Sequence, residues 1–187
     1  AASSHWRNSN ELGAHPLVLD PLNFDLRTTD SKAFGPLGGI SARIGWKHRF
    51  AHTLLQLPLR LLGIGYSGFH TVDKFAAGIA QTQRRAYDKD LLRHSLTLAL
   101  LQHHLSDSLD DGIIAVIGGG FANMSALLLS AHRKAKVIMV NLPKILLIDC
   151  VFLRKSLPNI NIRLVQSEEE MSDALSAPDV QCIALAA

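Results

Sequence analysis

The sequence has little cysteine, few aromatic residues and no long hydrophobic run. Two cysteines, Cys150 and Cys182, are too few for a disulfide framework or a four-thiolate zinc site, and they are typical of a reducing, cytoplasmic compartment. The longest apolar stretch, residues 54–69, contains Pro58 and Arg60, so it is too short and too interrupted for a membrane span. We therefore expect no stable membrane insertion and no metal site.

The chain also lacks a strong excess of charge. Its 187 residues include 19 Lys and Arg, 16 Asp and Glu, and 48% hydrophobic residues. This balance predicts a globular protein and gives no reason to expect a nucleic-acid partner. Within residues 41–104, however, nine basic residues stand against three acidic ones. We interpret this segment as a solvated face, with an acidic or phosphorylated partner as the alternative.

The N-terminal part is short of periodic apolar runs. The first 45 residues are rich in Pro, Gly, Asp and Ser, which predicts an irregular arm with turns near Asp20-Pro21 and Gly35-Pro36. Apolar residues then recur at helical spacing in residues 73–87 and, more strongly, in residues 88–105. Acidic residues at the start of the second helix suit its positive end.

Short apolar runs alternate with helical patterns from residue 113 onwards. The predicted strands are residues 113–117, 136–140, 161–165 and 180–185, and the predicted helices are residues 121–132, 143–156 and 168–175. A continuous apolar run such as IIAVI indicates a strand that is buried on both faces of a parallel sheet. The predicted fold class is α/β, a Rossmann-like parallel sheet of about four strands. We divide the chain into an N-terminal irregular arm and helical region, residues 1–82, and a Rossmann-like domain, residues 83–187.

The last predicted strand bears on the question of partners. In the doubly wound order 3-2-1-4, residues 180–185 form an edge strand. An uncovered apolar edge strand favours aggregation. We therefore expect either that a second copy or another chain covers this edge strand, or that the native protein continues beyond Ala187; we favour a truncated chain.

A glycine triplet follows the first predicted strand. Gly118, Gly119 and Gly120 permit a tight turn and the close approach of a ligand, because glycine has no Cβ. Free N–H groups at the start of the next helix favour a polar or anionic group. Asn141 ends the second strand about 21 residues after Gly120, at the position that faces the ribose of a nucleotide in a doubly wound sheet. This spacing predicts a nucleoside-type cofactor.

These two segments resemble S-adenosylmethionine-dependent methyltransferases, most closely the sugar O-methyltransferase family. In that family one strand ends in Glu-Ile-Gly-Gly-Gly and is followed by an aromatic residue, and a second strand ends in Asp-Leu-Pro. The chain has Ile117-Gly118-Gly119-Gly120-Phe121 and Asn141-Leu142-Pro143 at matching distance, and the similarity spans about residues 85–165. The chain departs from the family at three positions, which hold Val116, Ala122 and Asn141 in place of an acid, a glycine and the ribose-binding Asp.

The resemblance implies an incomplete methyltransferase fold with S-adenosylmethionine as cofactor. It implies that Gly118, Gly119, Gly120 and Phe121 surround the methionine and ribose parts of the cofactor, and that Asn141 and Leu142 lie near its ribose and adenine. The implied reaction is O-methyl transfer to a sugar or other carbohydrate hydroxyl, in which the protein positions the acceptor oxygen and a base removes its proton. The catalytic residues stay unassigned.

Two alternatives remain open at this stage. The three departures favour a non-catalytic methyltransferase-like fragment that acts through protein contacts. An NAD(P)-binding oxidoreductase is the other alternative, but its Gly-x-Gly-x-x-Gly pattern, counted from Gly118, requires glycine or alanine where Asn123 stands.

Overall fold

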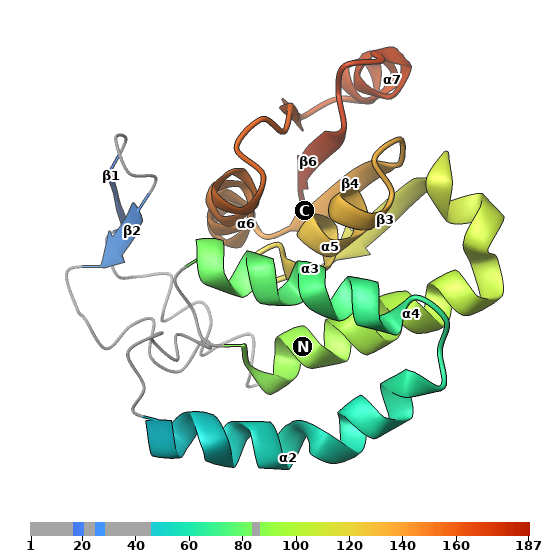
Figure 1. Cartoon of the computed structure of the whole chain (residues 1–187). Coiled ribbons are helices and arrows are strands. Elements are labelled where there is room, and N and C mark those ends of the chain that lie inside the picture. The colour runs from blue at the N-terminus through green and yellow to red at the C-terminus, as the bar shows by residue number, and fades with distance from the viewer. Residues whose placement is uncertain (1–16, 21–24, 29–45, 84–86) are drawn as a thin grey trace, which may run out of the picture. The chain divides into compact units, whose positions relative to one another are not determined.

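The computed structural model describes residues 17–20, 25–28, 46–83 and 87–187 (Figure 1). The chain forms two compact units, residues 1–40 and residues 41–187. The described elements of the second unit are α2 (Trp46–Ile64), α3 (Phe69–Thr82), α4 (Lys89–Asp110), β3 (Ile113–Ile117), α5 (Asn123–Ala131), β4 (Lys136–Asn141), α6 (Pro143–Ser156), β5 (Ile162–Val165), α7 (Glu168–Ser176) and β6 (Cys182–Ala186). The predicted domain boundary at residue 82 falls inside this unit, because α3 packs against α5 and α6.

The first unit contains an antiparallel pair of strands. β1 (Leu17–Asp20) lies against β2 (Asp25–Thr28), with Leu17 opposite Thr28 and Asp20 opposite Asp25. The prediction of an irregular arm is wrong for these two segments, whose four-residue runs are too short to show a reliable period of two. Pro21 and the turn predicted at Gly35-Pro36 lie outside the described residues.

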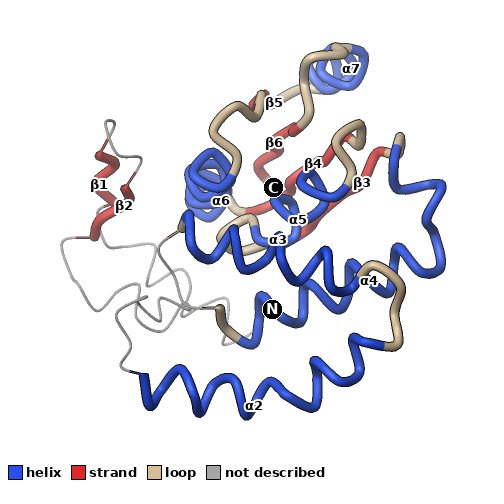
Figure 2. The backbone as a smooth tube through the Cα atoms, in the orientation of Figure 1, coloured by secondary structure: helices blue, strands red, loops and turns tan. Residues whose placement is uncertain are grey.

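The four strands of the second unit form an all-parallel sheet in the order β3-β4-β6-β5 (Figure 2). Strands alternate with helices from β3 to β6, which confirms the predicted Rossmann-like α/β class. β3 and α6 occupy the predicted residues, and the other strands and helices of this part begin and end within two residues of their predicted bounds.

The predicted strand order is wrong for the C-terminal strand. β6 lies between β4 and β5 rather than at an edge, and Cys182, Ile183 and Ala184 are fully buried. Its apolar run is therefore that of a central strand with both faces covered. We expected another chain to cover this strand because we placed it at an edge. The edge strands of the sheet are β3 and β5, so that reason no longer applies.

Helices cover the two faces of the sheet unequally. Alternate side chains of β4 and β6 point to opposite faces, as the pleat requires. The larger core joins one face to α5 and α6, with α3 and α4 packed behind them, and the smaller core joins the other face to α7. Lys136 fixes α7 to the sheet, because its Nζ donates to the Ala174, Leu175 and Ala177 carbonyls at the end of that helix.

β3 is exposed on one face, although its sequence predicted a strand buried on both. Ile114 and Val116 pack on the larger core, whereas Ile113 and Ile117 are 59% and 80% exposed. The cause is the strand order: α7 packs on β5 and β6, and β3 lies at the opposite edge of the sheet. A short apolar run does not by itself distinguish an edge strand from a central one.

The two helices predicted before the sheet have shifted bounds: α3 begins and ends earlier than predicted, and α4 ends later. α3 starts at Phe69, directly after Gly68, whose φ of 85° places it in the left-handed region. It ends at Thr82, so Tyr87 lies outside the helix that was predicted to contain it. α4 starts after Asp88, whose carboxylate accepts the Leu91 N–H at 2.8 Å, and this confirms the acid expected at its positive end.

Candidate functional site

The glycine turn lies at the carboxyl edge of the sheet, between β3 and α5. The Gly118 N–H donates to the Val140 carbonyl at 3.0 Å, which holds the turn beside the end of β4. Left-handed φ angles occur at Gly118 (70°), Gly120 (40°), Phe121 (58°) and Ala122 (51°). Glycine adopts this region without penalty, but Phe121 and Ala122 store backbone strain there. Strained backbone of this kind clusters at functional sites.

Hydrogen bonds and a ring contact from other elements hold the strained part of the turn. The Ala122 N–H donates to Asp149 Oδ1 at 3.0 Å, and Gln83 Nε2 donates to the Phe121 carbonyl at 3.3 Å. The Phe121 ring stacks edge-to-face on Phe152, with 4.9 Å between the ring centroids. Asp149 and Phe152 belong to α6, so that helix fixes the turn from one side.

Asp149 lies beneath the turn and is only 2% exposed. Its Oδ2 accepts from Asn141 Nδ2 at 2.8 Å, while its Oδ1 accepts from Ala122. Both partners are donors, a pattern that suits an ionised carboxylate. Burial nevertheless raises the pKa of Asp149, and the bonds from Asn141, Ala122 and Phe121 oppose that increase.

The predicted cofactor residues come together, but their side chains have different surroundings. Gly118 to Phe121 line the turn, and Asn141 and Leu142 stand next to it at the end of β4. Asn141 is buried; its Nδ2 bonds Asp149, and its Oδ1 accepts the Leu142 N–H at 2.9 Å. Asn141 keeps a second N–H and a second Oδ1 lone pair, but its burial limits their access to a ribose.

Open space and unpaired polar atoms adjoin the turn. A Cβ on Gly118 or Gly120 would meet no atom within 4 Å, so the backbone is accessible there. Among the described residues, the buried Asn123 Oδ1 and Ser125 Oγ have no hydrogen-bond partner. Both lie in the first turn of α5, directly after the glycine turn. A ligand hydroxyl or a water molecule would satisfy such an atom.

A cavity of about 420 Å³ lies at the other end of the sheet. Its lining comes from α3, from the end of α5 and from the residues that precede β5 and β6: Phe75, Leu129, Ser130, Arg133, Leu157, Pro158, Asn159, Ile160 and Gln181. Ligands of doubly wound folds bind beyond the carboxyl ends of the strands, so we do not assign this cavity to the cofactor.

In residues 46–83 and 87–187, no group of three His, Cys, Asp or Glu side chains could hold a metal ion. No helix in the described part of the chain is long and apolar enough to cross a membrane.

Sequence reasoning missed Asp149 and Gln83. Asp149 is the only acid in the apolar run of α6, and an isolated acid in such a run is a detectable signal of a specific buried partner. Gln83 gave no comparable signal, because it reaches the Phe121 carbonyl and Ser156 Oγ across the fold from the end of α3.

Comparison of the chain with known protein families, with curated proteins and with solved structures finds no match. The class that the structure defines is therefore the Rossmann-like α/β fold itself.

Proposed function

We propose that this chain binds S-adenosylmethionine at the β3–α5 turn and is a methyltransferase-type protein that transfers a methyl group to a carbohydrate hydroxyl. The observation that carries the proposal is the position of Asp149. Its carboxylate already accepts a hydrogen bond from the Ala122 N–H at the start of α5. In dinucleotide-binding turns such N–H groups face a pyrophosphate. Here a buried acid fills that role, which favours a ligand without phosphate.

The charge of the cofactor fits this arrangement. S-adenosylmethionine carries a sulfonium cation, and a carboxylate beneath the turn attracts a cation while repelling a pyrophosphate. The NAD(P) alternative requires a small residue at position 123, where the chain has Asn123, and Asp149 already accepts from one of the N–H groups at the start of the helix. The bound cofactor would supply an activated methyl group, while Gly118 and Gly120 would let it approach the backbone.

The acceptor is the less constrained part of the proposal. A carbohydrate hydroxyl follows from the family resemblance of the two glycine-turn segments, and the described residues give us no reason to assign a base. The unpaired Asn123 Oδ1 is an acceptor that a cofactor hydroxyl would satisfy. Asn141 supports the site by bonding Asp149.

Calorimetric titration tests this proposal with S-adenosylmethionine, which carries the sulfonium, and with S-adenosylhomocysteine, which shares its adenosine and amino-acid parts but lacks that charge. We expect micromolar binding that is lost in Gly120→Arg, which fills the open side of the turn, and kept in Gly78→Arg, which places the same side chain on the exposed face of α3. A folded wild-type chain that does not bind contradicts the proposal. Binding of NADP without binding of S-adenosylhomocysteine would favour the oxidoreductase alternative.

A non-catalytic protein that acts through protein contacts is the second candidate. The observation that favours it is the exposed apolar face of α2, which is unrelated to the glycine turn. Both candidate functions are consistent with the observed fold. A measurement of cofactor binding distinguishes them, because only the methyltransferase-type protein requires it.

A further inference from the structure

α2 turns an apolar face away from the other described helices of its unit. Seven of its large apolar side chains are between 47% and 77% exposed. They are Phe50, Leu54, Leu55, Leu57, Leu61, Leu62 and Ile64. The described part of the chain therefore leaves uncovered the helix face that amphipathic helices normally bury.

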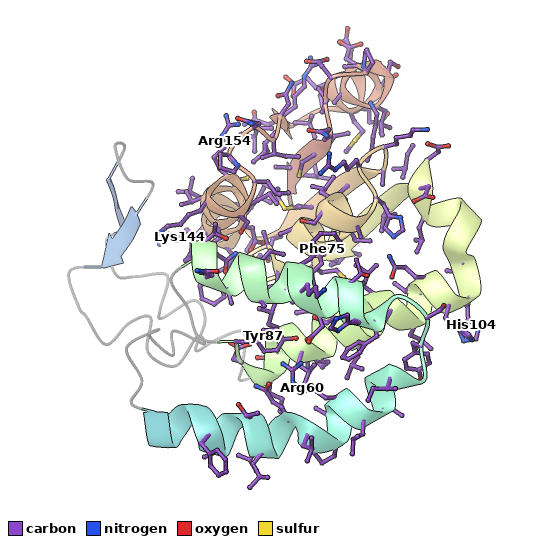
Figure 3. All side chains as sticks on the ribbon, in the orientation of Figure 1. Arg60, Phe75, Tyr87, His104, Lys144 and Arg154 are labelled. Carbon is purple, nitrogen blue, oxygen red and sulfur yellow. The ribbon has the colours of Figure 1, made fainter. Side chains whose placement is uncertain are left out.

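The opposite face of α2 holds the helix to its own unit through polar side chains and through Leu59, which packs on the cluster of Phe69, Leu92 and Ala99. Arg60 Nη1 pairs with Asp73 Oδ2 on α3 at 2.5 Å, and its guanidinium lies 4.8 Å from the centre of the Tyr87 ring. Tyr87 Oη donates to the other oxygen of Asp73 at 2.6 Å. The buried Gln56 donates to the Tyr87 carbonyl at 3.0 Å. Figure 3 shows Arg60 and Tyr87 between α2 and the rest of the unit. These polar contacts and Leu59 hold the helix with the exposed apolar side chains turned away from the other described helices.

The spacing of the exposed residues is that of helix–helix packing. Phe50, Leu54, Leu57, Leu61 and Ile64 follow one another at alternating intervals of four and three residues. This 3.5-residue period forms a straight seam against a second helix. Association with a lipid surface requires an apolar face but not this period.

The exposed area is that of an interface. Added together, the exposed areas of these seven residues correspond to about four fully exposed side chains. At roughly 150–200 Å² for each large apolar side chain, the face presents about 700 Å². The largest apolar patch of a typical monomer is about 300–600 Å², and a standard interface buries about 800 Å² on each partner. One helix of this kind thus supplies most of what a dimer interface needs.

The charges of α2 favour a second copy in antiparallel orientation. The first turn contains Lys47 and Arg49 and no acid, and the last turn contains no basic residue. Each end therefore leaves the helix dipole uncompensated, and the basic residues oppose the positive end of their own helix. In an antiparallel pair, the basic first turn of each helix lies beside the negative last turn of the other.

We propose that the chain forms a two-fold symmetric dimer through α2. In the antiparallel seam, Phe50 of one copy meets Leu61 of the other, and Leu54 meets Leu57. The same register places Ile64 opposite position 47 of the other copy, so the basic first turn of one helix lies beside the C-terminus of the other. Both contact types are repeated by the symmetry, so the interface is closed and self-complementary. The inference does not depend on the proposed cofactor.

Light scattering of the full chain over about 1–100 μM tests the dimer, a concentration range that spans the affinities of many weak and moderate interfaces. We expect a mass of two chains for the wild type and of one chain for Leu57→Glu/Leu61→Glu, whose dissociation constant rises at least about 100-fold because four charges meet in the seam. Leu147→Glu on α6 is the matched control: this leucine is exposed to the same extent as Leu57, and its variant keeps the mass of two chains.

The opposite results are equally clear. A wild-type chain that stays single at about 100 μM, a concentration where even weak dimers form, overturns the proposal. So does a double variant that still has the mass of two chains. A single chain that instead sediments with phosphatidylserine vesicles replaces the second copy with a lipid surface and also overturns it. If the double variant loses its helical circular dichroism, Leu57→Gln is measured in its place under the same criteria.

Discussion

Asp149→Ala removes the acceptor on which the glycine turn depends. The substitution leaves the Ala122 N–H and one Asn141 N–H buried without their partner. Each buried donor that loses its acceptor costs about 1–3 kcal/mol. Removing the buried carboxylate offsets part of this loss, because burial disfavours its charge. We expect the free energy of unfolding to fall by about 3 kcal/mol, a large fraction of the roughly 5–15 kcal/mol of a typical domain.

Urea unfolding followed by circular dichroism measures this loss. Asp173→Ala is the matched control, because it removes an exposed acid from helix α7 and is expected to change the unfolding free energy by less than about 0.5 kcal/mol. In a double-mutant cycle, Asn141→Ala costs less than Asp149→Ala, and the double variant is no less stable than Asp149→Ala alone. A loss below about 1 kcal/mol for Asp149→Ala, with an unchanged m-value, would refute the role we assign to this carboxylate.

The same substitution has a predicted pH dependence. Because burial raises the pKa of Asp149 in the folded state, the folded protein binds this proton more tightly than the unfolded chain does. The contribution of Asp149 to stability is therefore fully present below its unfolded pKa of about 4 and decreases as pH rises through the folded pKa. The stability difference between wild type and Asp149→Ala should thus be larger at pH 4 than at pH 7. An increase of this difference with pH would contradict the assigned direction.

Three further predictions concern backbone strain, an ion pair and thiol reactivity. Gly118→Ala forces a Cβ into left-handed backbone and should cost about 1–2 kcal/mol by thermal unfolding, whereas Gly78→Ala in α3 should stabilise by about 0.5–1 kcal/mol; equal effects would contradict this. Arg60→Met breaks a pair whose side chains are 29% and 20% exposed and should cost about 1–3 kcal/mol in urea, against less than about 0.5 kcal/mol for Arg93→Met, whose pair with Asp90 is 68% exposed. Burial raises the pKa of Cys150 to about 11 and that of Cys182 further, so at pH 8 both thiols should react with Ellman's reagent only slowly until urea is added; fast native labelling would refute this.

The sequence predicts the parts of the fold that local periodicity determines. The helix α6 and the strand β3 were predicted to the residue, because apolar spacing and the position of Pro143 are properties of neighbouring residues. Strand order is not such a property. IIAVI in β3 and CIALA in β6 are alike in composition, yet one is an edge strand and the other is central.

Some features of the candidate site could likewise be predicted from neighbouring residues, and others could not. The glycines could be placed at the turn because a strand and a helix flank them in sequence. The left-handed backbone at Phe121 and Ala122 could not be foreseen, since residues with a Cβ rarely adopt it and here depend on Asp149 and Gln83 from other helices. Likewise, no helix was predicted over residues 46–64, where Pro58 and a glycine interrupt the apolar pattern, and contacts with other helices such as that of Arg60 with Asp73 determine which face of α2 points inward.

The central claim is that the β3–α5 turn binds an adenosyl cofactor, and amide-resolved NMR during titration with S-adenosylhomocysteine tests it most directly. The account predicts that the amide signals of Gly118, Gly119 and Gly120 shift first, together with that of Leu142, and that those at the cavity near Arg133 do not change. A well-dispersed spectrum that does not respond, or one whose changes lie at the cavity instead of the turn, would contradict it.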